Sequence, residues 1–591
     1  MGVAASTITR PLSPGSPVAH YDGPMTTPPE RASDALVEAR VEARVDGRDA
    51  EEARVDSPTP AHAASSTHQG PPAMTRLDAW WGRLLSTPAR RRAWAWGGPI
   101  AVTLLAAVLR LWHLGRPGSL VFDETYYVKD AWTLHNLGYE AAWPADYDAT
   151  FAAGGADGFT TDPSFVAHPP LGKWLISLGM AALGPDDPAG WRLSTAVVGI
   201  LAVALVAVIG SLLLRSTLVG TLAGFLLAID GHAIVMSRVS LLDNFVMFFG
   251  LLAFGAVLLD RRWTSRRLDD WVTRRRGAGR DLAWGPAIWS RPWLLAAGLL
   301  CGLATGVKWN GLYFLAVFAV YTVVVDVLAR RRAGVEFWLT GTLWKQAPVS
   351  FLLTVPIALV AYVATWTGWF VTGGGYYRSW VEEGGQRWTG ALAWVPDVVQ
   401  NFWHYEAGVY AFNVGLATPH SYQANPFTWL LMLRPTSMYY QGFDQGQGGC
   451  EVARCGEAIT SVANPVIWYA AVAACLYLVY RVVRHREWRY GAILVGVAAG
   501  YLPWLAFSDR TVFQFYTIAF EPYLVLGLAA VLGIVLGRRT DHIDRRRSGI
   551  AVTAIVLVAA VAATVFFYPL WTAQLADWEF IRIHYWIPSW K

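Results

Sequence analysis

The chain has 591 residues, of which 54% are hydrophobic and 15% are charged. Soluble proteins carry about 25% charged residues, so the composition excludes a soluble multidomain protein, and long apolar runs exclude disorder over most of the chain. Four cysteines are too few for a disulfide-rich secreted scaffold. The net charge is only +5, so the positions of the charges carry more information than their sum.

The amino-terminal segment differs in composition from the rest. Residues 1–75 are rich in Ala, Pro, Ser, Asp, Glu and Arg and nearly lack large apolar side chains, which predicts a disordered tail. No apolar stretch follows the first methionine, so the tail is not a signal peptide. Residues 76–93 combine tryptophans and leucines with arginines and predict an amphipathic helix at the membrane surface. Residues 94–591 form the predicted membrane domain.

Eleven segments of this domain are apolar enough to cross a bilayer, which takes about 20 residues per helix. The sequence therefore predicts an all-α polytopic membrane protein. The expected spans are 98–114, 194–214, 217–236, 241–259, 293–308, 311–328, 347–369, 462–481, 490–507, 513–536 and 549–568.

Basic residues cluster in five regions, which eleven spans place on one side of the membrane. These regions are 90–92, 260–292, 329–346, 481–489 and 537–548. Because basic residues concentrate on the cytoplasmic side, we expect a cytoplasmic amino terminus and an extracytoplasmic carboxyl terminus. Two long loops, about 115–193 and 370–461, then face outward, and neither is long enough for an added domain beyond small helices.

The most informative short motif is FDETYY, residues 122–127, directly after the first span. Asp123 and Glu124 are adjacent carboxylates at the outer membrane face, where one of them could accept a proton from a hydroxyl group. The structural alternative is that Asp123 caps the following helix and Glu124 lies in its first turn. The residues alone favour this alternative slightly.

Several cationic residues are expected at the same outer face. HPPLGKW contains His168 and Lys173, and GWRLSTA contains Arg192 at the outer end of the second span. These side chains could hold a lipid phosphate, with arginine acting as a bidentate fork. Equally, His168 could cap a loop, and Lys173 and Arg192 could simply extend their charged ends to the membrane interface.

Three further motifs place charges in short outer turns or loops. SRVSLLDNF contains Arg238 and Asp243, which could simply pair with each other, and GVKWNG contains Lys308. Arg434 lies in the second outer loop and is the weakest candidate. Cations beside carboxylates at one interface suit a lipid-phosphate donor, and these three motifs are consistent with that chemistry.

The sequence lacks the motifs of several other site types. Neither GxxxxGK[ST] nor a GxGxxG after a predicted strand is present, so a transferred group would come from a lipid donor, and nothing indicates a nucleic-acid partner. No zinc-site spacing is present. Cys301 and Cys475 lie in apolar runs, whereas Cys450 and Cys455 lie in an outer loop and are expected to form a disulfide in an oxidising compartment.

The spaced motifs resemble the protein O-mannosyltransferases, most closely the actinobacterial polyprenol-phosphate-mannose–protein mannosyltransferases. FDETYY, HPPLGKW, SRVSLLDNF and GVKWNG occur in the family's order, and NPFTWLLMLRPTSMYY (residues 425–440) and the aromatic carboxyl end (585–590) also look like this family. The resemblance covers roughly residues 95–591.

The resemblance implies a GT-C membrane glycosyltransferase in the cell membrane with its active site on the outer face. Mannose would move from polyprenyl-phosphate-mannose to Ser or Thr hydroxyls of exported proteins, with inversion, and the secretion translocon is a candidate partner. Asp123 matches the expected base, Glu124 its acidic neighbour and Arg192 a donor-site arginine. In this reading Lys173 or Arg238 would help Arg192 to stabilise the phosphate.

Two alternatives remain at this point. Another GT-C enzyme could transfer a lipid-linked sugar to a glycan or lipid, and a transporter would have no transferase activity. The charged motifs here lie at the ends of spans rather than at mid-membrane, which disfavours a transporter. The proposed chemistry requires no metal, although a divalent ion at Asp123 or Glu124 is left open.

Overall fold

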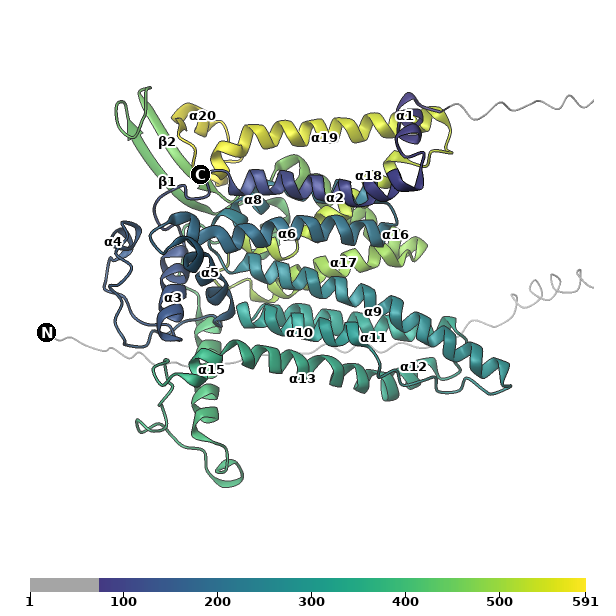
Figure 1. Cartoon of the computed structure of the whole chain (residues 1–591), viewed down its shortest axis with the longest axis horizontal. Helices are drawn as coiled ribbons and strands as arrows, with labels where there is room; N and C mark the ends of the chain where they lie inside the picture. The colour runs from purple at the N-terminus through teal and green to yellow at the C-terminus, as the bar shows by residue number, and fades with distance from the viewer. Residues whose placement is uncertain (1–73) are drawn as a thin grey trace, which may run out of the picture. The chain divides into compact units, whose positions relative to one another are not determined.

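The structure, a computed structural model, describes residues 74–591. The predicted disordered tail, residues 1–75, lies outside the described residues except for its last two positions. The described chain is a bundle of long helices that run side by side, with short helices and a small sheet gathered at one end (Figure 1).

Helices lie at all eleven predicted spans. Eight are long and apolar enough to cross a membrane, and a ninth span is the pair α7–α8, which is bent by 61°. The remaining two, α10 and α18, have only 16 residues each. The helices at the eleven predicted spans are α2 (Pro88–Leu111), α6 (Pro188–Leu214), α7 (Thr217–Ile229) with α8 (Gly231–Arg238), α9 (Asp243–Gly277), α10 (Pro292–Val307), α11 (Gly311–Arg332), α13 (Ala347–Thr365), α16 (Pro465–His485), α17 (Trp488–Tyr501), α18 (Glu521–Leu536) and α19 (Ile543–Trp571).

The break between α7 and α8 has a local cause. Asp230 has an extended backbone, and its side chain accepts hydrogen bonds from the backbone N–H groups of His232 and Ala233. An aspartate in this position starts a new helix, so the chain turns within the membrane domain and brings α8 toward its outer end.

The predicted surface helix over residues 76–93 is shorter than expected. α1 (Arg76–Leu84) is capped by Thr75 and tied down by an ion pair of 2.7 Å between Asp78 and Arg546. Thr87 caps a new helix whose first residue is Pro88, a favoured position for proline. The arginines at 90–92 therefore belong to the first span and not to a separate surface helix.

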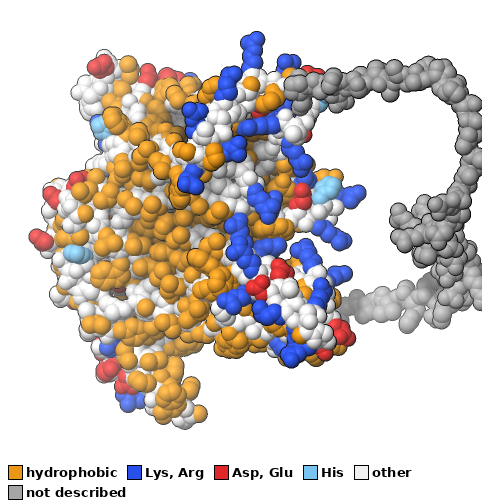
Figure 2. All heavy atoms as spheres, turned by 45° about the vertical axis from the view of Figure 1, so that its right-hand side comes forward, with side chains coloured by type: hydrophobic (Ala, Val, Ile, Leu, Met, Phe, Trp, Pro, Cys, Tyr) orange, Lys and Arg blue, Asp and Glu red, His pale blue; other side chains and the backbone are white. Residues whose placement is uncertain are grey.

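The five basic regions meet at one end of the bundle. Arg546 reaches α1, the guanidinium of Arg261 in α9 stacks on the indole of Trp488 in α17 at 3.9 Å, and Lys345 lies over Trp284. Figure 2 shows lysines and arginines gathered at this end beside a broad hydrophobic surface. The prediction that these regions share one side is confirmed.

The opposite end carries α3 (Glu124–Leu137), α4 (Asp148–Ala152), α5 (Leu171–Leu183), α14 (Thr367–Val371), α15 (Asp397–Gly415) and α20 (Trp578–Arg582). The second loop also contains an antiparallel hairpin, β1 (Ser437–Asp444) and β2 (Arg454–Thr460), extended by β3 (Ala576–Asp577). The sequence analysis did not predict this hairpin. A disulfide joins Cys450, in the turn of this hairpin, to Cys455 in β2, as expected.

Candidate active site

Asp123 lies where the chain leaves α2 and enters α3. Phe122 before it has a φ of 49°, which is uncommon for an aromatic residue. Asp123 occupies the N-cap position of α3, but its side chain makes no capping hydrogen bond. The Tyr127 hydroxyl donates to Asp123 Oδ2 at 3.3 Å instead. The helix-cap alternative therefore does not account for this carboxylate.

The surroundings of Asp123 make its carboxylate more basic than usual. Burial raises the pKa of Asp123 to about 6, although the charge of Lys308 acts in the opposite direction. The neighbouring charge of Asp243 raises this pKa further. A carboxylate with a pKa of about 6 is ionised at neutral pH and is a better proton acceptor than an ordinary aspartate.

Lys308 and Asp243 join two helix ends. α9 begins at Asp243 and α10 ends directly before Lys308. The Lys308 ammonium donates to both carboxylate oxygens of Asp243 at 3.1 Å and lies 4.1 Å from the centre of the Tyr516 ring. Both charged residues are buried, so this pair fixes a cation at the end of the bundle opposite the basic regions.

A cavity of about 220 Å³ opens beside Lys308. Arg510 lines it; its Nη2 donates to Asn413 at 2.7 Å, while its buried Nε has no hydrogen-bond partner among residues 74–591. An unpaired guanidinium N–H is suited to an anionic ligand. The lining residues are His168, Lys308, Trp309, Asn310, Leu312, Tyr313, Tyr410, Asn413, Val414, Trp504, Phe507 and Arg510.

His168 contributes an uncharged side chain to this cavity. Burial lowers the pKa of His168 well below its usual value, and the charges of Lys308, Lys173 and Arg510 lower it further. The imidazole is therefore neutral at pH 7. Lys308 and Lys173 are paired with Asp243 and Glu140, whereas Arg510 forms no ion pair with residues 74–591 and has an unpaired Nε that can bind a phosphate group.

Glu124 and Arg192 form a buried structural pair. Arg192 Nε and Nη2 donate to the two oxygens of Glu124, both at 2.8 Å. The remaining N–H groups of Arg192 bind the carbonyl oxygens of Pro117 and Ser119, and both charged side chains are fully buried. The guanidinium of Arg192 is thus hydrogen-bonded to Glu124 and to backbone carbonyl groups, and the Glu124 carboxylate is bound by Arg192.

Three other predicted phosphate or substrate ligands are also engaged by the chain itself. Arg238 donates to the carbonyl oxygens of Arg110, Trp112 and His113, which end α2. The buried Lys173 ammonium lies 2.5 Å from Glu140 and 3.9 Å from Asp130. Lys173 therefore contributes charge to the site, but its hydrogen bonds are used elsewhere.

Arg434 is placed differently from the expectation as well. Its guanidinium binds the carbonyl oxygens of Ser589 and Lys591 at 2.6 Å and that of Ser421 at 2.8 Å. It thus fastens the carboxyl terminus to the second outer loop and does not face the cavity. The pairing of Arg238 with Asp243, which the sequence left open, is replaced by the pair of Lys308 with Asp243.

Sequence reasoning missed Arg510. The residue lies in FSDRT, in the short segment between the predicted spans 490–507 and 513–536. Its position in an outer turn was the available signal, since a charge between two closely spaced spans is expected at the membrane surface. Among residues 74–591 no group of three or more His, Cys, Asp or Glu side chains is placed to hold a metal ion.

Comparison with known proteins assigns the chain to a family. The family model of dolichyl-phosphate-mannose-protein mannosyltransferases matches residues 100–274, and that of the C-terminal four-helix membrane region of protein O-mannosyltransferases matches residues 398–590. The chain belongs to the protein O-mannosyltransferase family. It is therefore a glycosyltransferase, and the resemblance stated from its motifs is confirmed.

Curated relatives match along most of the chain. A polyprenol-phosphate-mannose–protein mannosyltransferase of Mycolicibacterium smegmatis (strain MKD8) is 34% identical over 511 residues, which is 85% of this chain and 94% of the relative. The corresponding protein of Mycobacterium tuberculosis (strain H37Rv) is also 34% identical, over 85% of this chain and 92% of the relative. That of Corynebacterium glutamicum is 30% identical over 80% of this chain and 89% of the relative.

The fold matches a solved member of the family. The protein O-mannosyltransferase complex Pmt1–Pmt2 of Saccharomyces cerevisiae, solved with its sugar donor, aligns with a TM-score of 0.59 and 14% identity, over 88% of this chain and 95% of that one. At this identity the match concerns the fold alone. It supports the GT-C membrane architecture expected from the sequence.

Proposed function

We propose that this protein transfers mannose from a polyprenyl-phosphate-mannose donor to Ser or Thr hydroxyls of exported proteins. The family membership and the names of the bacterial relatives support the donor and acceptor classes. The observation that carries the proposal within this chain is Asp123, a carboxylate free of ion pairs in the described chain, which lies close enough to Lys308 to feel its charge. Lys308 and Arg510 line the cavity at the same end of the bundle.

The proposed reaction is a single displacement at the anomeric carbon. Asp123 takes the proton of the acceptor hydroxyl while the hydroxyl oxygen attacks the anomeric carbon. The bond from this carbon to the phosphate oxygen breaks, and the polyprenyl phosphate leaves as a monoester with an additional negative charge. Attack opposite the leaving group inverts the configuration of the sugar.

The cations of the cavity stabilise the leaving phosphate. Arg510 has an unsatisfied N–H, and Lys308 is held in place by Asp243. Because both are largely shielded from water, their interaction with developing charge is stronger than at an exposed surface. Neutral His168 can hydrogen-bond the phosphate or sugar without adding charge. We assign donor binding to Lys308 and Arg510, in place of Arg192 and Arg238.

Aromatic residues suit the sugar and the lipid. Trp309, Tyr410 and Trp504 line the cavity, and their faces can pack against the apolar face of a hexose. Leu312 and Val414 extend the apolar part of the lining. A polyprenyl chain could therefore remain in the bilayer while its mannosyl phosphate enters between charged and aromatic groups.

The proposed orientation follows from the charges. The basic end of the bundle lies in the cytoplasm and the cavity faces the exterior of the cell membrane. Exported polypeptides reach this face as they emerge from the secretion translocon, which is the proposed macromolecular partner. The disulfide between Cys450 and Cys455 lies at the same end as the cavity, which fits an oxidising exterior.

The proposal is tested by incubating membranes that contain the protein with labelled polyprenyl-phosphate-mannose and a Ser/Thr peptide. We expect label on the peptide, and none when the Ser and Thr residues are replaced by alanine. Label that appears only on a glycan or a lipid would favour the alternative GT-C transferase. Mannose in the β configuration on the peptide after use of an α-linked donor, or the reverse, would establish inversion.

A further inference from the structure

The cytoplasmic end of α6 and α9 contains a basic pocket with no carboxylate in its lining. Five arginines surround a cavity of about 470 Å³, and none of them forms an ion pair with residues 74–591. Uncompensated positive charge in a pocket predicts an anionic ligand. The five are Arg215, Arg261, Arg262, Arg266 and Arg489.

The geometry of two of these arginines is fixed by the fold. The guanidinium of Arg261 stacks on the indole of Trp488 at 3.9 Å, and Nη2 of Arg262 donates to the carbonyl oxygen of Leu212 at 2.8 Å. The other three have no hydrogen bond from the guanidinium to a described residue. Fixed and free guanidinium groups together form a site in which several N–H groups can converge on one phosphate.

An apolar cavity of about 280 Å³ adjoins this pocket. The two share Leu212, Leu213, Arg262 and Trp488 in their linings, so they lie side by side on the same residues. Apolar side chains of α6, α9 and α10 line the second cavity, and several of them, such as Leu212 and Trp293, are exposed on the outer surface of the bundle. This surface faces the acyl chains of the membrane.

The arrangement follows the periodicity of the helices. On α9 one face carries Leu252, Gly255, Ala256 and Leu259 at helical spacing and then continues into Arg262. On α6 the corresponding face carries Leu205, Val208, Ile209 and Leu212 and ends at Arg215. Both faces thus change from apolar to basic at the same end of the groove between them.

We propose that this composite cavity binds an anionic glycerophospholipid of the cytoplasmic leaflet. The phosphate and anionic headgroup would lie among the five arginines, and an acyl chain would lie in the groove between α6, α9 and α10. Charge complementarity selects the anionic headgroup, and the adjoining apolar cavity selects a lipid over a free phosphate. This site lies at the opposite end of the bundle from Asp123 and is independent of the proposed transferase function.

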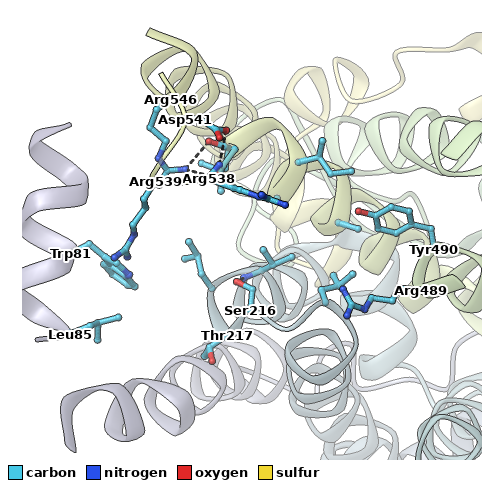
Figure 3. A pocket seen from close by; sticks show the side chains of 18 of the residues that line it. Trp81, Leu85, Ser216, Thr217, Arg489, Tyr490, Arg538, Arg539, Asp541 and Arg546 are labelled. Carbon is cyan, nitrogen blue, oxygen red and sulfur yellow. Dashed lines mark hydrogen bonds between the residues drawn. The ribbon is translucent and has the colours of Figure 1, made fainter. Parts of the chain in front are cut away.

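A larger cavity nearby differs from the basic pocket because its lining contains carboxylates. An open cavity of about 870 Å³ lies between α1, α2, α7, α17, α18 and α19 (Figure 3), with Trp81 and Leu85 on the α1 side. Its arginines are partly neutralised within the chain, since Arg546 and Arg539 pair with Asp78, and Arg481 pairs with Glu487. Arg489 borders both cavities.

The proposal is tested by native mass spectrometry of the detergent-purified full chain with dioleoyl phosphatidylglycerol or dioleoyl phosphatidylcholine. We expect the anionic lipid to bind at least tenfold more tightly. Since one basic side chain at an anionic surface changes affinity roughly fivefold, the triple variant R215Q/R262Q/R266Q should bind phosphatidylglycerol about 100-fold more weakly. Equal binding of the two lipids, or wild-type binding by this variant, would overturn the proposal.

A matched control removes the same charge elsewhere. R274Q/R280Q/R332Q neutralises three exposed arginines at the same end of the bundle that line neither cavity, and it should bind phosphatidylglycerol like the wild type. An equal loss in this control would mean that net charge, and not the pocket, attracts the lipid, and the proposal would be wrong.

A second variant keeps all five arginines and tests the lipid chain. A Cβ atom added at Gly255 would lie 3.5 Å from Ile209 Cδ1, an ordinary contact, so Gly255→Leu should fold while its side chain fills the groove. We expect about tenfold weaker binding, which corresponds to one or two displaced methylenes. Unchanged lipid binding by Gly255→Leu, or complete displacement of the lipid by millimolar inorganic phosphate, would indicate a simple phosphate site and refute the lipid proposal.

Discussion

Asp123 and Glu124 are neighbours in sequence, and the structure predicts opposite consequences for their amide variants. Asp123→Asn keeps the size of the side chain and removes its ability to take a proton. The only hydrogen bond to the Asp123 side chain from the described chain comes from the Tyr127 hydroxyl at 3.3 Å, and an asparagine oxygen can accept the same bond. No capping interaction is lost, because none is present.

The expected effect of Asp123→Asn is therefore on turnover and not on folding. Loss of a general base typically lowers the rate by about 10²–10⁴-fold. The change in stability should stay below about 1 kcal/mol, since one weak neutral hydrogen bond is at stake. Burial disfavours the charged form of Asp123, so the neutral amide could even stabilise the fold slightly.

Glu124→Gln should behave in the reverse way. It removes the charge that Arg192 binds with two hydrogen bonds of 2.8 Å and leaves a buried guanidinium without a counter-charge. Breaking one side of a buried ion pair costs about 3–5 kcal/mol. We expect a low yield of folded protein and a lower temperature of unfolding, while the molecules that fold with Asp123 in its native position should retain turnover.

The assay measures initial rates of mannose transfer to a Ser/Thr peptide, divided by the amount of folded protein, together with the thermal unfolding of each purified variant. The matched pair of variants separates chemistry from folding. Near-normal transfer by well-folded Asp123→Asn would refute the assignment of the base. A stable Glu124→Gln protein with a large loss of turnover would show that Glu124, and not only Asp123, takes part in the reaction.

Three other predictions concern the site and the topology. Arg510→Gln should raise the KM for the lipid donor about tenfold or more because a charge-assisted hydrogen bond is lost. Arg510→Lys should restore only part of the affinity, because a point charge cannot replace the fork. A KM unchanged in both variants would exclude Arg510 from donor binding. The kcat/KM of transfer should fall as pH decreases through about 6, because protonation of Asp123 removes the proton acceptor. The decrease should be absent from the residual activity of Asp123→Asn. A wild-type profile that stays flat from pH 8 to well below 6 would contradict this assignment. Reporter fusions at residue 270 should report a cytoplasmic location and fusions at residue 150 an extracytoplasmic one; the reverse result at either position would invalidate the orientation.

The fold could be predicted from the sequence to a large extent because the membrane imposes a simple pattern. A span requires a long apolar run, and helices lie at all eleven runs that were identified, including α10 and α18, which have only 16 residues. The hairpin in the second outer loop was missed. Its strands SMYYQGFD and RCGEAIT are short and polar in part, and outside the bilayer such segments carry no comparably strong constraint.

The site could be predicted only in part because sequence position indicates which end of a span a charge occupies, but not its partner. Lys308 and Arg192 are both cations at outer span ends, yet the structure pairs Arg192 with Glu124 from a segment 68 residues away. It pairs Lys308 with Asp243 at the rim of the cavity. The sequence indicated the charge of Arg192 but not its engagement with Glu124. Only the three-dimensional contacts distinguish a guanidinium that is fully used from one, Arg510, that has a donor to spare.

Arg192 and Arg238, which the sequence suggested as phosphate ligands, hold the backbone around Asp123. Arg192 ties the start of α3 to α6 through Glu124, and Arg238 in α8 holds the carbonyl groups that end α2. Asp123 lies between these two attachment points, one residue before Glu124. A general base must stay within hydrogen-bond distance of its hydroxyl through the reaction, and an error of about 1 Å can reduce the rate by about 100-fold. The buried arginines thus hold the backbone on either side of Asp123, which explains why strongly engaged, non-reacting charges lie so close to the one carboxylate that is left free.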